Sequence, residues 1–102
     1  MTEKTIEDID RLIHEPARLL ILCNLYVVES ADFVYLQNQT GLTRGNLSSH
    51  MSKLEEAGLI EVNKEFVGKK PQTLLRLTDA GRQALSQYGD TMTDLLDGIA
   101  TE

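Results

Sequence analysis

A face of small hydrogen-bonding residues runs along the segment from Thr40 to Ile60, TGLTRGNLSSHMSKLEEAGLI. If Leu47 faces the core and each helical residue advances by about 100°, Met51 and Leu54 join it in a buried stripe. The small hydrogen-bonding side chains on the opposite side would let the helix approach the floor of a DNA major groove, where Asn pairs with adenine and Ser with several bases. An exposed glycine inside a helix costs about 1 kcal/mol relative to alanine, so a steric reason for it is expected. The side opposite the stripe and its shoulders carry Gly45, Asn46, Ser48, Ser49, Ser52, Lys53 and Glu56.

The charge of the chain has to be divided by segment before a polyanionic partner is considered. The net charge is -6, but residues 1–32 and residues 77–102 each contribute -4. Residues 33–76 hold six Lys or Arg and four Asp or Glu, a net of +2. Arg44 falls in the first turn of the predicted helix, where the helix dipole and its own charge both favour a phosphate. The middle of the chain therefore permits nucleic-acid binding, with a modest positive charge.

Each of these residues also has an ordinary structural explanation. Exposed serines make a soluble surface, and two lysines at a hairpin tip, Lys69 and Lys70, often only solubilise a turn. His50 falls at the edge of the buried stripe, where we expect a packed, hydrogen-bonded side chain rather than a base contact. We also expect the single cysteine, Cys23, to pack in the core.

Capping signals predict the elements that position this face. Pro16 opens a strongly apolar helix. Asp32 caps a short helix that Gly41 ends, and Thr43 caps the longer helix that Gly58 closes. A short helix, a tight turn containing glycine and a longer helix form a helix-turn-helix.

The rest of the chain predicts a β-hairpin and two further helices. The segments LIEVNKEFV and QTLLRLT have the pattern of paired strands, with GKKP as their turn. Apolar residues at the N-terminus define an amphipathic helix: Ile6, Ile9, Leu12 and Ile13. A last helix, capped by Thr78, has apolar residues at the spacings of a coiled-coil seam: Leu85, Tyr88, Met92, Leu95 and Ile99. Both apolar faces need a cover, which a symmetric homodimer would supply. The alternative is that the last helix, which Gly89 and Gly98 interrupt, folds back on its own domain.

Length and composition narrow the remaining choices. A chain of 102 residues with 41% hydrophobic and 25% charged residues suits one small globular domain. No apolar run approaches the ~20 residues of a membrane span, and the acidic N-terminus lacks the apolar core of a secretory signal. One cysteine makes a reducing, cytoplasmic location the default. Two histidines and one cysteine form no nucleophile–base pair or ligand cluster, so we expect no enzyme, no metal site and no cofactor.

Together, the motifs GLTRGNLSSHMSKLEEAGLIE and F.GKKPQT..RLT.AGR resemble small stand-alone winged helix-turn-helix transcriptional regulators related to the MarR and ArsR groups. The resemblance covers roughly residues 12–86. It implies a mainly α fold with a small β-hairpin (α+β) and with N- and C-terminal dimerisation helices. The expected organisation is one domain over 1–102, with the helix-turn-helix at about 32–58, the wing at about 59–78 and the C-terminal dimerisation helix at about 79–99.

The resemblance also implies a homodimeric, sequence-specific DNA-binding transcriptional regulator. Its recognition helix, 43–57, would enter the major groove, and its wing, 68–73, would touch the backbone or the minor groove. Carried over by position, the DNA contacts would be Thr43, Arg44, Gly45, Asn46, Ser48, Ser49, Lys53, Lys69, Lys70, Gln72, Thr73 and Arg76. The dimer interface would use Ile6, Ile9, Ile13, Leu85, Tyr88, Met92, Leu95 and Ile99.

Two questions stay open at the level of sequence. An effector, unknown in kind, would bind at the dimer interface around the first and last helices. The alternative function is a winged-helix module that binds protein and no DNA, since the fold is reused in that way. The overall acidity favours the alternative, whereas the lack of an exposed apolar anchor between Arg44 and Lys53 disfavours it.

Overall fold

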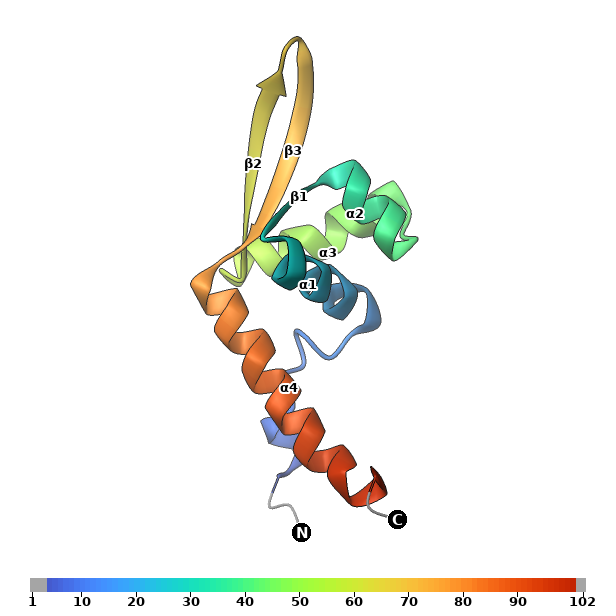
Figure 1. Ribbon diagram of the computed structural model, residues 1–102, viewed down its shortest axis with the longest axis vertical. Helices are drawn as coiled ribbons and strands as arrows, with labels where there is room; N and C mark the ends of the chain where they lie inside the picture. The colour runs from blue at the N-terminus through green and yellow to red at the C-terminus, as the bar shows by residue number, and fades with distance from the viewer. Residues whose placement is uncertain (1–3, 101–102) are drawn as a thin grey trace.

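The computed structural model describes residues 4–100, whose elements are arranged as Figure 1 shows. The helices are the 3-10 turn Ile6–Asp8 (η1), Pro16–Val28 (α1), Phe33–Thr40 (α2), Arg44–Glu56 (α3) and Asp79–Ala100 (α4). The strands are Ser30–Asp32 (β1), Ile60–Val67 (β2) and Lys70–Leu77 (β3). The hairpin of β2 and β3 projects from one end of the molecule and α4 from the other, with the three short helices between them (Figure 1).

The boundaries of α2 and α3 follow the predicted caps. Oδ1 of Asp32 accepts a 2.7 Å hydrogen bond from the backbone N–H of Tyr35 at the start of α2. Gly41 ends this helix with a left-handed φ of 73°, which glycine adopts without strain. The Thr43 hydroxyl accepts a 3.1 Å bond from the third residue of α3. Gly58, at φ 79°, follows the end of α3, so α2 and α3 form the helix-turn-helix that the fold class implies.

The sheet has three antiparallel strands in the order β1-β3-β2, one strand more than the predicted hairpin. β2 and β3 pair from Ile60 opposite Leu77 out to Val67 opposite Lys70. β1 pairs with residues 74–76 of β3, at the base of the hairpin. Its three residues are too few to show a period, which explains why the sequence pattern missed this strand. The two-stranded part of the hairpin beyond β1, residues 64–73, is called the wing below.

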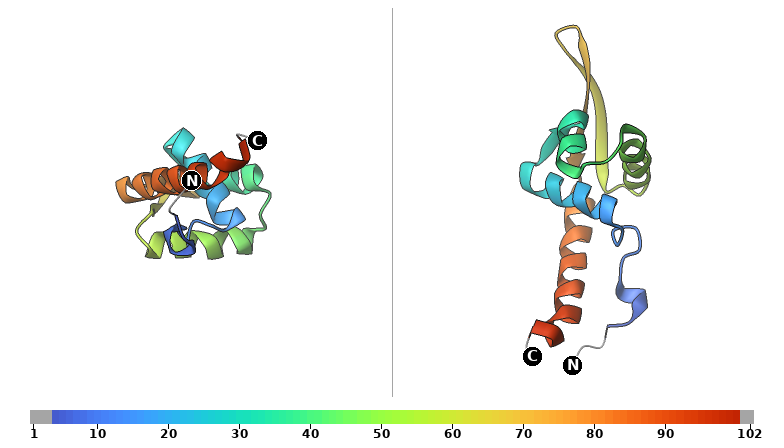
Figure 2. Two further views of the ribbon diagram at one scale, coloured as in Figure 1. Left: turned by 90° about the horizontal axis from the view of Figure 1, so that it is seen from below. Right: turned by 90° about the vertical axis from the view of Figure 1, so that its right-hand side faces the viewer.

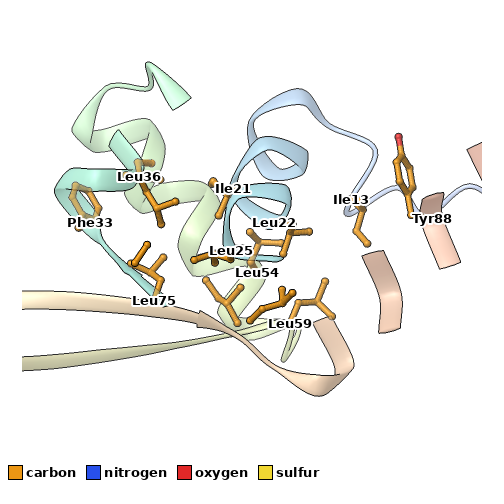
Figure 3. Packing of buried hydrophobic residues seen from close by; sticks show 14 residues of the cluster. Ile13, Ile21, Leu22, Leu25, Phe33, Leu36, Leu54, Leu59, Leu75 and Tyr88 are labelled. Carbon is orange, nitrogen blue, oxygen red and sulfur yellow. The ribbon is translucent and has the colours of Figure 1, made fainter. Parts of the chain in front are cut away.

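One apolar cluster joins α1, α2 and α3 to the base of the sheet (Figure 3). Burying one such side chain contributes about 1.5–3 kcal/mol, so the cluster fixes α3 against α1 and the sheet. On β3, Leu75 and Leu77 are buried and Arg76 is exposed, as expected for a strand with one face on the core. The largest fully buried side chains are Ile13, Ile21, Leu22, Leu25, Leu36, Leu47, Leu54 and Leu75.

The N-terminal segment does not form the amphipathic helix that its apolar residues predicted. The 3-10 turn Ile6–Asp8 is followed by a bend, in which the Asp10 carboxylate accepts bonds from the N–H groups of Leu12 and Ile13 at 2.9 and 3.2 Å. Aspartate competes with a helix by binding its own backbone in this way. Ile13 is fully buried, whereas the Ile6 side chain is 69% exposed.

The outer side of α1 is apolar and exposed. The prediction that Cys23 packs in the core was wrong, because the structure exposes it. Leu20 and Val27 are exposed on the same side, at helical spacing from Cys23, and the Val27 side chain is 79% exposed. The core covers the other side of α1, so the all-round apolar composition of this helix did not mean all-round burial.

α4 starts close to the end of α3 and then extends away from the sheet (Figures 1 and 2). As predicted, Thr78 caps it, accepting a 2.9 Å bond from the N–H of Gly81. A Cβ at Gly81 would overlap the carbonyl oxygen of Leu59, so glycine permits this close approach. Arg82 lies over the ring of Tyr26 on α1, 4.7 Å from its centroid, and adds a second contact at the root of α4.

Candidate nucleic-acid interface

The outer face of α3 carries the residues predicted for it. Leu47 and Leu54 are fully buried and Met51 is half-buried, so the predicted stripe is confirmed. From its start to Lys53 the face consists of small polar groups with two cations, Arg44 and Lys53, and the acids Glu55 and Glu56 are exposed at the C-terminal end of the helix. The exposed residues from the cap to Lys53 are Thr43, Arg44, Gly45, Asn46, Ser48, Ser49, Ser52 and Lys53.

Gly45 has no structural reason within the protomer to be glycine. No heavy atom lies within 4 Å of the position that a Cβ would take, and its φ is not in the left-handed region. Glycine within a helix nevertheless costs about 1 kcal/mol relative to alanine. The contacts within the protomer therefore do not explain the glycine at this position.

Phe33, at the start of α2, holds the side chain of Arg44. The guanidinium carbon lies 5.2 Å from the centroid of the Phe33 ring, and Phe33 itself is buried in the core cluster. A cation over an aromatic face gains about 0.5–1 kcal/mol at an exposed site. Arg44 is thereby directed across the front of α2. The sequence pattern does not indicate Phe33 as a partner of Arg44, because no spacing rule links a residue before the turn to one after it.

A groove of about 650 Å³ separates the wing from the starts of α2 and α3. Three cations line it, Arg44, Lys64 and Lys70, against one acid, Asp32. A concave surface with an excess of one charge concentrates counter-charges, and a row of phosphates suits this one. The other lining residues are Phe33, Val34, Ser48, Met51, Val67, Pro71, Gln72 and Thr73.

Lys64 was missing from the predicted contacts, although the strand pattern could have indicated it. Side chains two residues apart on a strand share a face, and Ile60 and Val62 point their side of β2 at the core. Lys64 continues this face into the groove.

The wing ends in a tighter turn than predicted. Val67 pairs with Lys70, so the turn consists of Gly68 and Lys69, and Lys70 and Pro71 already belong to β3. Gly68 has a φ of 66°, as the first position of a type II′ hairpin turn requires. Lys69 and Lys70 are both exposed at the tip.

Gln72, Thr73 and Arg76, the other predicted DNA contacts of the hairpin, differ in their exposure and in the hydrogen bonds they make within the fold. Nε2 of Gln72 donates a 3.1 Å hydrogen bond to Oδ2 of Asp32, so part of its amide is used within the fold. Thr73 is half-buried and lines the groove. Arg76 is exposed at the base of the sheet, directly opposite Glu61 of β2.

His50 packs as the sequence predicted, on the side of α3 that meets α1. Its Nδ1 lies 3.2 Å from Nη1 of Arg18, and Nε of Arg18 donates to the carbonyl of Leu12 at 2.6 Å. The Glu15 carboxylate lies 3.9 Å from His50 Nδ1. It accepts a 2.8 Å bond from the backbone N–H of Arg18, which lowers the pKa of Glu15. This cluster ties the N-terminal segment and α1 to the back of α3.

The residues predicted for a dimer interface fall into three groups. Ile13 and Tyr88 are buried in the protomer itself, and the Tyr88 hydroxyl lies 2.8 Å from Nδ1 of His14. These two residues therefore present almost no surface to a partner. Ile6 and Ile99 are 69% and 71% exposed. The half-buried residues are Ile9, Leu85, Met92 and Leu95.

Two features are not found within residues 4–100. No three or more His, Cys, Asp or Glu side chains are grouped so that they could hold a metal ion. None of the helices there is long and apolar enough to cross a membrane.

A helix-turn-helix with a projecting hairpin beside its second helix defines the winged-helix class. Residues 17–96 match the family of winged helix DNA-binding domains, and the chain belongs to this family. The uncharacterised protein MJ0432 of Methanocaldococcus jannaschii is 36% identical over 78 residues, which cover 76% of this chain and 85% of that protein.

Solved structures agree with this assignment. The transcriptional regulator homologue of Pyrococcus horikoshii OT3 has a TM-score of 0.83 and 30% identity, covering 88% of this chain and 89% of its own. NadR in complex with 4-hydroxyphenylacetate has a TM-score of 0.69 and 24% identity, covering 86% of this chain and 64% of its own. Family and neighbours together identify a winged-helix, DNA-binding transcriptional regulator.

Proposed function

We propose that the protein is a homodimeric regulator that binds specific DNA sequences, with residues 43–57 in the major groove and wing residues 68–73 on the backbone or minor groove. One observation carries the proposal. The small polar face of α3 borders a groove in which Arg44, Lys64 and Lys70 outnumber Asp32. A helix face suited to base edges thus lies beside a cationic groove suited to phosphates. The proposed role is DNA binding without catalysis, and the proposed location is the cytoplasm.

Each group of residues has its own part in this complex. Asn46, Ser48 and Ser49 meet base edges, and Gly45 leaves room for them to approach. The start of α3, with its free N–H groups, its cap Thr43 and the Arg44 guanidinium, meets a phosphate. The remaining phosphate contacts come from Lys53, Lys64, Lys69, Lys70, Thr73 and Arg76, with the free carbonyl of Gln72 as a further polar group.

The apolar side chains that α4 exposes support the proposed homodimer. Ile99 and Leu96 are 71% and 52% exposed near the end of the helix, and Met92 and Leu95 are half-buried beside them. Apolar side chains in such a row favour a second helix against them. A two-fold axis along α4 would present two copies of α3 to successive major grooves.

An effector would act close to this helix. The N-terminal segment runs beside α4 (Figure 2). An open polar crevice of about 480 Å³ lies between them, and Tyr88 and Thr91 line it from the α4 side. NadR, which shares this fold, has been solved in complex with 4-hydroxyphenylacetate, and this supports a small-molecule ligand here. We propose a small-molecule effector of unassigned chemistry at this crevice.

DNA binding at two salt concentrations tests the proposed function. A labelled random-sequence duplex is titrated by fluorescence anisotropy at about 50 and about 200 mM salt. A dimer that neutralises roughly 6–10 phosphates should lose about 10³–10⁵ in affinity over this range. Arg44→Ala and Asn46→Ala should weaken binding to a duplex selected from a random pool. Arg11→Ala, an exposed arginine on the N-terminal segment, is the matched control. The absence of binding at the lower salt concentration would contradict the proposal and favour a protein partner.

A further inference from the structure

The wing carries a large aromatic side chain that is mostly exposed. Phe66 is 74% exposed on β2, two residues before the turn. It lies three residues beyond Asn63, whose partner Leu74 is the last β3 residue that β1 covers. At about 3.4 Å per residue, the ring stands about 10 Å beyond the three-stranded sheet. The core cluster does not include Phe66, so its apolar surface does not contribute to the buried core.

The register places Phe66 on a defined face of the hairpin. Side chains alternate along a strand, so Phe66 shares the face of Lys64 and, further in, of the core residues Val62 and Ile60. Its cross-strand partner on that face is Pro71, which supplies a second apolar group. The acids of β2, Glu61 and Glu65, have the opposite parity and lie on the other face. The Phe66 face therefore carries a cation and no acid.

The charge at the tip identifies the partner of this aromatic group. Lys69 and Lys70 follow Phe66 at the turn, and Lys64 precedes it in the groove. An apolar anchor surrounded by cations fits a polyanion that also offers an apolar surface. Duplex DNA does so in the minor groove, where proteins insert apolar wedges between base steps. Aromatic rings stack on bases in the same way with little dependence on sequence.

We propose that Phe66, backed by Pro71, is a DNA-contacting wedge that enters the minor groove next to the site of α3. The inference rests on the proposed DNA binding and adds a residue and a mode of recognition to it. An apolar ring makes no hydrogen bonds to the donors and acceptors of the bases. Its preference for a sequence would therefore depend on how easily two neighbouring base pairs unstack. Flanking pyrimidine–purine steps, which unstack most easily, are therefore preferred at the wing.

The experiment measures affinity and base unstacking on the same DNA. A duplex selected from a random pool by the wild-type protein carries 2-aminopurine, a base whose fluorescence rises on unstacking, at the flanking step. Wild-type protein should raise this fluorescence. Phe66→Ala should abolish the rise and weaken binding about tenfold. Val27→Ala removes an equally exposed apolar side chain from α1 and is expected to change neither. Thermal unfolding should be alike in all three, because neither side chain is buried.

Failure of the wedge differs from failure of DNA binding. If wild-type protein binds the duplex and Phe66→Ala binds within twofold of it with the same fluorescence, the wedge is overturned and the proposed function stands. If wild-type protein selects no sequence and binds no duplex at low salt, the proposed function is overturned, and the wedge with it.

Discussion

The carboxylate of Asp32 joins the wing to the helix-turn-helix through its hydrogen bond with Gln72. Its Oδ2 accepts from Gln72 Nε2 at 3.1 Å, while its Oδ1 caps α2 through the N–H of Tyr35 at 2.7 Å. One side chain therefore starts the first helix of the helix-turn-helix and holds the strand that leads to the wing. Among residues 4–100, β3 has no strand beside it on that edge beyond β1, so we expect this bond to help hold the wing at its angle to α3.

Substitutions at Asp32 should separate its two functions. Asp32→Ala loses the cap and should lower the unfolding free energy by about 1 kcal/mol. Asp32→Ser keeps a capping oxygen but is too short to reach Gln72, so it should be nearly as stable as wild type and yet bind DNA more weakly. Gln72→Ala should match Asp32→Ser. Urea unfolding and anisotropy titrations check both quantities. Full DNA affinity in Asp32→Ser would show that the tether does not position the wing.

Gly45→Ala should change stability and DNA binding in opposite directions. The added methyl meets no atom within 4 Å, so the helix should gain about 1 kcal/mol from its better propensity. If α3 lies in the major groove, the same methyl blocks close approach and should weaken binding about tenfold, or about 1.4 kcal/mol. Ser86→Ala, an exposed change on α4, is the control for both measurements. A variant that is more stable and binds equally well would remove Gly45 from the interface.

The elements that local signals define were predictable from the sequence. Thr43 and Gly41 each fix a helix end through their own backbone or side-chain geometry, so a pattern of single residues suffices. The buried stripe of Leu47 and Leu54 follows from helical periodicity in the same way. Local signals therefore suffice to predict which side of α3 is exposed.

Features that depend on tertiary contacts were not predictable. The pairing of β1 with β3 joins residues more than forty positions apart and leaves no period in three residues. The N-terminal apolar pattern predicted a helix, yet Asp10 stabilises a bend through two backbone N–H groups. Phe33 beneath Arg44 and Lys64 in the groove depend on where separate elements meet. Local sequence patterns thus predict α3, whereas the groove beside it depends on how separate elements pack.

Two glycines of α4 should respond oppositely to the same substitution. Gly81→Ala puts a methyl onto the carbonyl oxygen of Leu59, which is backbone and cannot move aside cheaply. Overpacking of this kind costs about 1–3 kcal/mol, and the root of α4 should loosen. Gly89→Ala has open space around its Cβ and should stabilise the helix by about 1 kcal/mol. Thermal unfolding of the two variants under identical conditions checks the difference. Equal melting temperatures would contradict the close approach of α4 to Leu59.

Charges on the outer end of α4 should dissociate the proposed homodimer without unfolding the protomer. Ile99→Glu places a carboxylate where the wild-type side chain is 71% exposed, so the protomer loses little. In a symmetric interface the change occurs twice, and like charges then face each other. Light scattering should give the dimer mass for wild type and the monomer mass for the variant. Val27→Glu, on the outer side of α1, is the control and should stay dimeric. A wild-type monomer at micromolar concentration would contradict the homodimer.

Acid should remove the stabilisation that Glu15 provides. Its carboxylate accepts a bond from the Arg18 backbone N–H, which lowers the pKa of Glu15 in the folded protein, with a smaller effect of His50. A lowered folded pKa means that the contribution is complete above the unfolded value, about 4.3, and is lost as pH falls through the folded value. Glu15→Gln keeps a neutral acceptor at the cap but cannot titrate. The unfolding free energy of wild type should therefore exceed that of Glu15→Gln at pH 7, and the difference should shrink as the pH falls. Urea unfolding at pH 7 and pH 3 measures this, and a difference that persisted unchanged at pH 3 would show that the charge of Glu15 plays no part.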